Sequence, residues 1–207
     1  MTPPVLVHVP AARWERWVAN FGTRHPGTHL AVVDGALVGT SADGSGFEAR
    51  LPFAASYSGA PEPAAFLAAR VLPERWGVLL VRKGGYAVAR LAGDTTVASK
   101  VGTRHVQGRT KAGGQSQQRF ARRRANQAQA AYDAAAEHAH RVWGPGRLVV
   151  VAGGDRTAVA DVLEDGRLEA ETVAPFLDVP DPRRAVLDQA IADAAALQVR
   201  VANAPGT

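Results

Sequence analysis

The amino-acid sequence predicts an α/β fold in which a mixed sheet is flanked by helices. In the C-terminal half, apolar runs of strand length alternate with helical segments, an order typical of a layer with parallel strand pairings. The stretch 117–143 contains neither Gly nor Pro and predicts one long helix. Apolar residues make up 46% of the 207 residues and charged residues 21%, which is a globular composition.

The first part of the chain is expected to contain two helices and a hairpin. Apolar side chains recur at helical spacing after Pro10, and two short apolar runs flank Asp34-Gly35. This dipeptide is typical of a two-residue hairpin turn. The elements expected here are a helix over 10–21, a hairpin over 29–39, a strand over 47–53 and a helix over 64–72.

Turn signals divide the rest of the chain. Lys83-Gly84-Gly85 separates two β-rich runs and predicts a second hairpin. Gly144-Pro145-Gly146 ends the long helix, and Asp181 is a suitable N-cap for a closing helix. The elements expected here are strands over 76–81, 86–91, 95–106 and 147–152, a helix over 156–163, strand and loop over 168–179, and a helix over 182–201.

The length suits one large domain or two small ones. We expect residues 71–207 to form the main α/β domain. Residues 1–70 are expected to form either a small subdomain or an extension of the same sheet.

The composition excludes several kinds of chemistry. The absence of Cys excludes disulfides, thiolate catalysis and cysteine–zinc sites. His138 and His140 stand two apart on a predicted helix, so they point in different directions, and we expect neither a metal nor a cofactor. Neither a signal peptide nor an apolar run of about 18 residues is visible, so a cytoplasmic protein without a membrane partner is expected.

Gly153-Gly154-Asp155 follows a predicted strand and precedes a predicted helix. Such a turn can hold a phosphate on its N–H groups. It lacks the Lys-Ser/Thr pair of a P-loop and the third glycine of a dinucleotide site. A tight strand-to-helix turn is therefore the favoured interpretation.

Positive charge is concentrated in one segment. From Thr95 to Tyr132 there is no Asp or Glu, whereas the net charge of the chain is +5. The segment carries eight cations, so the remainder of the chain sums to about −3. Such local charge indicates a polyanionic partner. The cations are Lys100, Arg104, Arg109, Lys111, Arg119, Arg122, Arg123 and Arg124.

Gly113-Gly114-Gln115 stands at the centre of this basic segment. The two glycines allow backbone conformations with φ > 0 and a close approach to another surface. Glutamine does not titrate, so it is a poor acid or base, but it can orient a water molecule or donate to a developing oxyanion. The pattern predicts an exposed loop suited to hydrolysis beside phosphates.

The run 102–127 (GTRHVQGRTKAGGQSQQRFARRRANQ) resembles the catalytic loop and following helix of the middle domain of eukaryotic and archaeal peptide-chain release factors. It resembles still more closely the Vms-like release factors, which are peptidyl-tRNA hydrolases of ribosome quality control, and their short actinobacterial members. The run 148–156 resembles the strand and glycine turn that follow. The resemblance covers roughly 75–200. It implies a release-factor middle-domain-like fold, with 71–207 as the catalytic domain and a long helix after an exposed GGQ loop.

The resemblance implies that Gln115 is the catalytic glutamine and that Gly113 and Gly114 shape its loop. The expected reaction is codon-independent hydrolysis of peptidyl-tRNA on stalled or split ribosomes, because no segment is long enough to be a separate stop-codon-reading domain. The expected partners are large-subunit rRNA and the tRNA acceptor end, not DNA. The alternative is a non-catalytic RNA- or ribosome-binding module. The residues expected to bind RNA phosphates are Arg109, Lys111, Arg119, Arg122 and Arg123.

Overall fold

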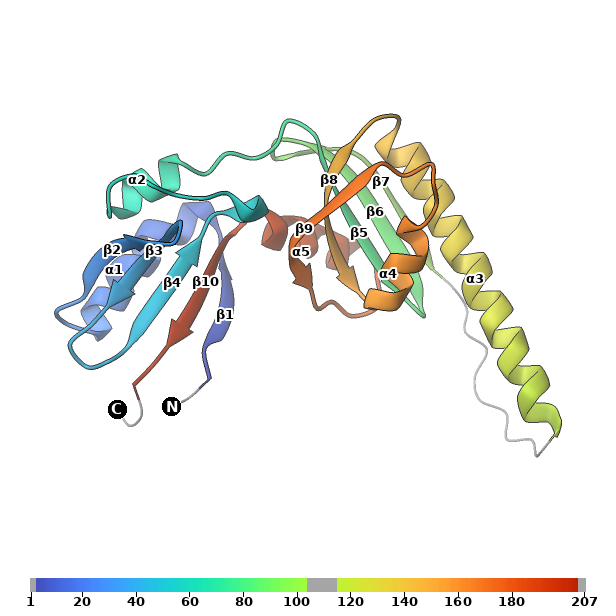
Figure 1. Cartoon of the computed structure of the whole chain (residues 1–207), viewed down its shortest axis with the longest axis horizontal. Coiled ribbons are helices and arrows are strands. Elements are labelled where there is room, and N and C mark those ends of the chain that lie inside the picture. Colours follow the sequence, from blue (N-terminus) through green and yellow to red (C-terminus); the bar gives the residue numbers. More distant parts are fainter. Residues whose placement is uncertain (1–2, 104–114, 205–207) are drawn as a thin grey trace. The chain divides into compact units, whose positions relative to one another are not determined.

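A computed structural model describes the backbone of residues 3–103 and 115–204, and the side chains of residues 3–102 and 129–204. The chain divides into two compact units (Figure 1). The first comprises Met1–Leu72 together with Ala192–Thr207, and the second comprises Pro73–Ile191. None of the helices in the described part of the chain has the length and apolar character needed to cross a bilayer.

The first unit contains an antiparallel sheet with the strand order β1-β10-β4-β3-β2. The expected hairpin is confirmed: β2 and β3 pair from Val33 and Ala36 outward, and Asp34 and Gly35 form the turn with φ of 47° and 75°. The strands are β1 (Val5–Val9), β2 (His29–Val33), β3 (Ala36–Thr40), β4 (Gly46–Arg50) and β10 (Leu197–Ala202).

Helix α1 (Trp14–Arg24) supplies much of the core of this unit. Trp14 is fully buried, and its indole Nε1 donates to the carbonyl of Pro63, the first residue of α2 (Pro63–Ala68), at 2.9 Å. Phe47 meets the rings of Trp14 and Phe21 edge to face, a favourable geometry for aromatic pairs. Two single turns, η1 (Ala11–Arg13) and η2 (Pro52–Ala54), complete the unit.

Two strands of this sheet differ from the sequence predictions. The helix expected over 182–201 ends at Ala195, and β10 follows it. In β10, apolar and polar residues alternate with the period of two that suits a strand, and β10 pairs with both β1 and β4. The partner β1 was not expected at all, although Val5, Val7 and Val9 show the same period.

The second unit contains a sheet with the strand order β7-β6-β5-β8-β9. Strand β5 pairs antiparallel with β6 and parallel with β8, which in turn pairs parallel with β9. The predicted mixed α/β architecture is thereby confirmed. The strands are β5 (Trp76–Arg82), β6 (Gly85–Ala92), β7 (Thr95–Thr103), β8 (Leu148–Gly154) and β9 (Ala170–Leu177).

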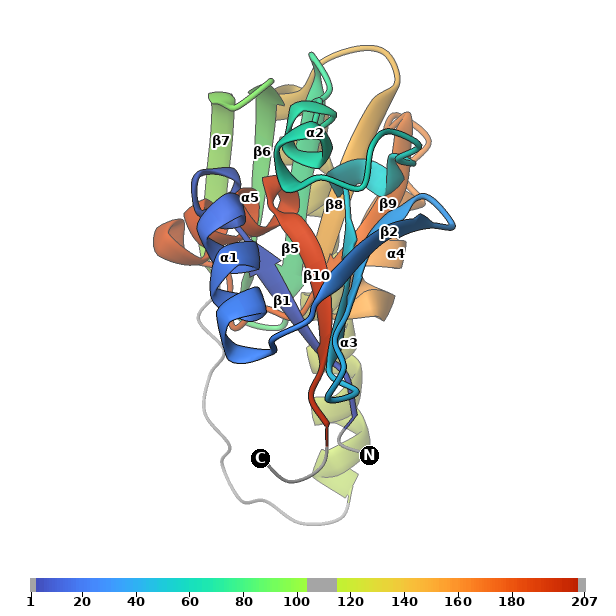
Figure 2. The same cartoon turned by 90° about the vertical axis from the view of Figure 1, so that its left-hand side faces the viewer.

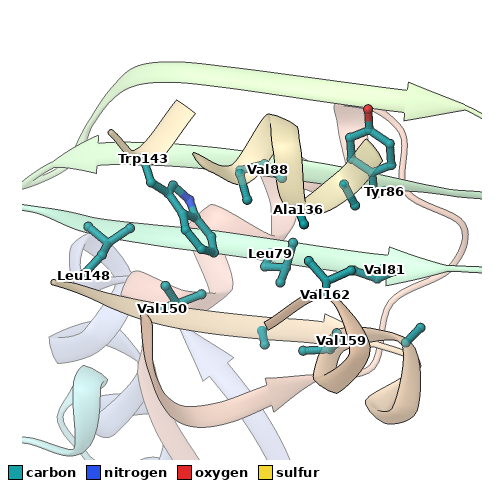
Figure 3. Close-up of a cluster of buried hydrophobic side chains, with 14 residues drawn as sticks. Leu79, Val81, Tyr86, Val88, Ala136, Trp143, Leu148, Val150, Val159 and Val162 are labelled. Carbon is teal, nitrogen blue, oxygen red and sulfur yellow. The ribbon is translucent and has the colours of Figure 1, made fainter. Parts of the chain in front are cut away.

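Helices lie on both faces of this sheet. On one face, α3 (Gln115–Trp143) and α4 (Arg156–Leu163) share a core with β5, β6 and β8 (Figure 3). Helix α5 (Arg184–Ala195) lies on the opposite face. Its Arg184 donates to the hydroxyl of Ser99 on β7, and because successive side chains of a strand point to opposite faces, Ser99 points away from α3. The long helix expected from residue 117 is confirmed and starts at Gln115.

The turn between β8 and α4 is closed by its own side chains. Asp155 is the N-cap of α4, and its carboxylate accepts hydrogen bonds from the N–H groups of Thr157 and Ala158 at 3.0 and 3.2 Å. Gly154 has φ of 99°, and a Cβ there would lie 2.3 Å from the carbonyl oxygen of Val81. The carboxylate of Asp155 already accepts from two of the N–H groups that a phosphate would need, which supports the interpretation of this segment as a tight strand-to-helix turn.

We expect Asp155→Ala to lower the free energy of unfolding by about 1 kcal/mol, the usual cost of losing an N-cap. Chemical denaturation of the purified variant measures this. Asp155→Asn is the matched control, because an Asn side chain caps helices about as well as Asp. Equal stability of the Ala variant and the wild type would show that the cap contributes nothing.

Candidate functional site

The predicted catalytic loop lies between β7 and α3. Four of its predicted site residues, Arg109, Lys111, Gly113 and Gly114, lie outside the described residues. The described backbone ends at Thr103 on β7 and resumes at Gln115.

Gln115 is the first residue of α3. Arg119, Arg122 and Arg123 follow in its first turns, at spacings that place them on one side of a helix. The structure thus gives these four predicted site residues a helical backbone, while their side chains lie outside the described part. The site prediction itself stays a prediction.

Among the side chains of α3 that the structure describes, the buried ones lie in the second half of the helix. Ala135, Ala136, Ala139 and Trp143 are buried in the core of the unit, whereas Gln129 and the residue after it are exposed. Figure 1 shows the first turns of α3 running beyond the strands of the sheet. A helix of 29 residues is about 43 Å long, so its start is held far from the core.

The C-terminal end of α3 is anchored by two polar contacts. The guanidinium of Arg75 donates to the carbonyl oxygens of Trp143 and Pro145 at 2.6 and 2.8 Å. A cation there also interacts favourably with the negative end of the helix dipole. The buried indole Nε1 of Trp143 donates to the carbonyl of Ala89 on β6 at 3.0 Å. Together these contacts fix the end of the helix to β6 and to Arg75, the residue immediately before β5.

A ring stack holds α3 at the point where β7 ends. Tyr86 of β6 is 8% exposed, and its ring stacks on His138 of α3 with centroids 5.7 Å apart. Gly102, near the end of β7, leaves room for this ring: a Cβ there would lie 2.3 Å from Cζ of Tyr86. Burial raises the pKa of the Tyr86 hydroxyl. We call Tyr86, Gly102 and His138 the α3 seat.

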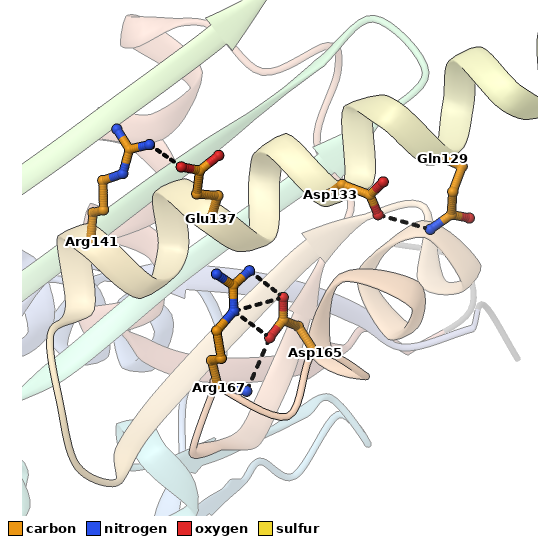
Figure 4. A network of polar contacts seen from close by, with 6 residues as sticks. All are labelled: Gln129, Asp133, Glu137, Arg141, Asp165 and Arg167. Atoms are coloured by element: carbon orange, nitrogen blue, oxygen red, sulfur yellow. Dashed lines mark hydrogen bonds and ion pairs between the residues drawn. The ribbon is translucent and has the colours of Figure 1, made fainter.

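The acidic residues of the packed half of α3 are paired (Figure 4). Gln129 donates to Asp133 at 3.1 Å, and Arg141 forms an i,i+4 ion pair with Glu137 that lowers the pKa of this carboxyl group. Negative charge on this half of the helix is therefore partnered. The first half of α3 carries no acid at all.

The turn after α4 carries a second ion pair. Hydrogen bonds from Arg167 lower the pKa of Asp165 to about 2 (Figure 4). A depressed carboxyl pKa stabilises the fold above the ordinary Asp value of about 4, and this contribution is lost as the pH falls through about 2.

The sequence analysis dismissed His138 and His140 as a pair of metal ligands. His138 belongs to the α3 seat. Within the described parts of the chain, no group of three or more His, Asp or Glu residues could hold a metal ion. Sequence reasoning did not identify the α3 seat; its one local signal is Gly102, a glycine inside a strand, which often marks a close approach of another group.

Comparison with known proteins supplies the family. A sequence profile described as Actinobacteria/chloroflexi VLRF1 release factor matches residues 74–200, more than half of the chain. The match includes β7, α3 and the loop residues between them. Comparison with curated proteins finds no match.

We expect Gly102→Ala to destabilise the protein by about 1–3 kcal/mol, because the added methyl group forces the Tyr86 ring out of place. Tyr86→Leu should also destabilise the protein. The double variant should lose less free energy of unfolding than the two single variants lose together, since the smaller Leu side chain removes the clash with the methyl group at position 102. Denaturation of all three variants completes the cycle.

Gly166→Ala is the matched control for this cycle, because a Cβ at Gly166 meets no atom within 4 Å. Its effect should stay within about 0.5 kcal/mol. Strict additivity of Gly102→Ala and Tyr86→Leu would show that the two residues do not compete for the same space.

Proposed function

The chain belongs to the Actinobacteria/chloroflexi VLRF1 release-factor family, and we propose that it hydrolyses the ester bond of peptidyl-tRNA on stalled or split ribosomes without reading a codon. The observation that carries this proposal is the position of Gln115. It follows two glycines and begins a long helix whose far end is anchored in the core. A group carried in this way reaches a recessed ester more easily than one on the surface of a sheet.

In the proposed reaction, a water molecule attacks the ester carbonyl that joins the peptide to the tRNA 3′ end. Its oxygen bonds to the carbonyl carbon, a tetrahedral oxyanion forms, and the bond to the ribose oxygen then breaks. One proton of the water ends on the ribose oxygen, which gives a free peptide acid and a tRNA hydroxyl. The side chain of Gln115 orients the water, and its amide or backbone N–H donates to the developing oxyanion.

Gly113 and Gly114 have a separate role in the proposal. They allow the backbone before Gln115 to adopt φ > 0 and to pass close to RNA, which side chains with a Cβ would hinder. The role given to the glutamine needs no proton exchange with its side chain.

The proposed RNA contacts come from the acid-free segment. Arg109 and Lys111 in the loop, with Arg119, Arg122 and Arg123 on α3, bind phosphates of large-subunit rRNA or of the tRNA acceptor end. Phosphate contacts position a protein without reading sequence, which suits release independent of the codon. We further propose that the unit Pro73–Ile191 is the catalytic domain, and that the other unit is an accessory subdomain.

We expect Gln115→Ala to reduce peptide release 10²–10³-fold while the protein stays folded, because losing one oriented donor costs about 3–4 kcal/mol in the transition state. Release from purified peptidyl-tRNA–large-subunit complexes measures this. Gln129→Ala is the matched control: it is the same residue type on the same helix, it is exposed, and among the described side chains it donates a hydrogen bond to Asp133. If Gln115→Ala releases peptide as fast as the wild type, Gln115 is not the catalytic residue. If the wild type binds the complexes but releases no peptide, the protein is a binding module and the catalytic proposal fails.

We expect Arg119→Ala, Arg122→Ala and Arg123→Ala together to weaken binding to the large subunit. The plot of log K against log salt should become flatter by roughly 2, since each lost phosphate contact removes about 0.7–0.9 from the slope. The control removes three arginines that are ion-paired, Arg141, Arg147 and Arg167, and should leave the slope almost unchanged. An unchanged slope in the first variant would mean that this side of α3 is only solvated.

A further inference from the structure

Helix α1 lies in the part of the chain before the family match and carries an unusual surface. Arg13, immediately before the helix, and Arg16 and Arg24 within it are all exposed. At 100° per residue, these positions and Asn20 fall within about 80° of one another around the helix axis. We call Arg13, Arg16 and Arg24 the α1 arginine stripe. It runs for about 16 Å along the helix.

The stripe is not neutralised within the described residues. No ion pair there involves any of its three arginines, whereas Arg50 in the same unit pairs with Glu48. The single acid on α1, Glu15, lies about 100° around the helix from Arg16. The positive charge of the stripe therefore faces solvent.

The stripe is not part of a general positive charge on its unit. Residues 1–72 and 192–207 contain six Arg or Lys and six Asp or Glu, so the unit is neutral as a whole. Half of its cations nevertheless lie on one side of one helix. A general excess of arginine in the chain does not produce such a separation of charge.

The stability of α1 does not explain the stripe either. The positive end of the helix dipole disfavours cations near the first turn, where Arg13 and Arg16 stand, and like charges at i,i+3 repel. Only Arg24, in the last turn, gains from the dipole. Two of the three arginines thus cost the helix stability, which indicates that they serve an external anion.

The surroundings of Trp17 indicate which part of a nucleic acid the stripe is suited to bind. Its half-buried ring borders the stripe and stacks on Trp14 and on Phe21, one turn before and one turn after it, with interplanar angles of 7° and 20°. Because Trp17 is committed to these internal stacks, it is a poor platform for a nucleic-acid base. The stripe is thus suited to phosphates of a backbone and not to bases.

We propose that Arg13, Arg16 and Arg24 form a second RNA-phosphate-binding surface, separate from the loop and α3, that holds the backbone of large-subunit rRNA. This inference rests on the proposed function for the identity of the RNA. Charge complementarity selects this partner: the ribosome is a polyanion with phosphates spaced closely enough for several to meet a 16 Å stripe. Binding there is independent of base sequence.

The test compares two triple variants of the full chain: Arg13→Ala, Arg16→Ala, Arg24→Ala, and the ion-paired control Arg141→Ala, Arg147→Ala, Arg167→Ala. Both lose the same net charge. Affinity for large subunits and for protein-free large-subunit rRNA is measured at several salt concentrations. For the stripe variant, the plot of log K against log salt should be flatter by roughly 2, both with large subunits and with protein-free rRNA. The control variant should show almost none of this change. Substituting Lys at the three stripe positions should preserve most of the slope.

The melting temperature of the stripe variant should not fall below that of the wild type. An unchanged slope would overturn the inference. A loss of affinity for intact subunits but not for rRNA would also overturn it, since the partner would then be a ribosomal protein. The proposed function fails by a different result, binding of the wild-type protein to peptidyl-tRNA–large-subunit complexes without any release of peptide, which leaves the slope measurement unaffected.

Discussion

Burial of one side of α3 against β6 and α4 is the interaction on which the position of Gln115 depends. The buried residues among the described side chains of α3 lie in its second half, and His138 lies 23 residues, or about 35 Å, from Gln115. At that distance a tilt of about 5° moves the start of the helix by about 3 Å, whereas a misplacement of about 1 Å can cost 10²-fold in rate. The role proposed for Gln115 therefore requires the fold to hold the helix direction more stiffly than stability alone requires.

Small residues provide this stiffness. Ala135, Ala136 and Ala139 let the helix backbone come close to the sheet, and close-packed interiors yield little to strain. Arg75 fixes the last carbonyls of the helix, while the α3 seat fixes it one to two turns earlier. Two separated attachments resist tilting better than one. Both of these attachments lie in the second half of the helix.

The sequence predicted the elements whose signals are local. The long helix, the Asp34-Gly35 hairpin and the mixed sheet were all expected, because breakers, turn dipeptides and periodicity act within a few residues. It failed for β10, where a strand with period two follows a helix without a Gly or Pro between them, and for its partner β1. The sequence did not predict the α3 seat for a related reason: Tyr86 and His138 lie far apart in the sequence and meet only in the tertiary structure. The prediction that Gly113, Gly114 and Gln115 form a catalytic loop rests on the sequence motif and on the family.

The central place of β10 also governs the order of folding. This strand lies between β1 and β4, so the first sheet is incomplete until residues 197–202 have been synthesised, after the whole of the second unit. Domains generally fold as units during synthesis, starting from the N-terminus. All strands of the second unit are synthesised before β10. If β4 paired with β10 before the second unit folded, the unfolded residues between them would form a long flexible loop, and closing such a loop has an entropic cost. The unit that begins the chain is thus the last to fold, and until then β1 and β4 each lack a neighbouring strand.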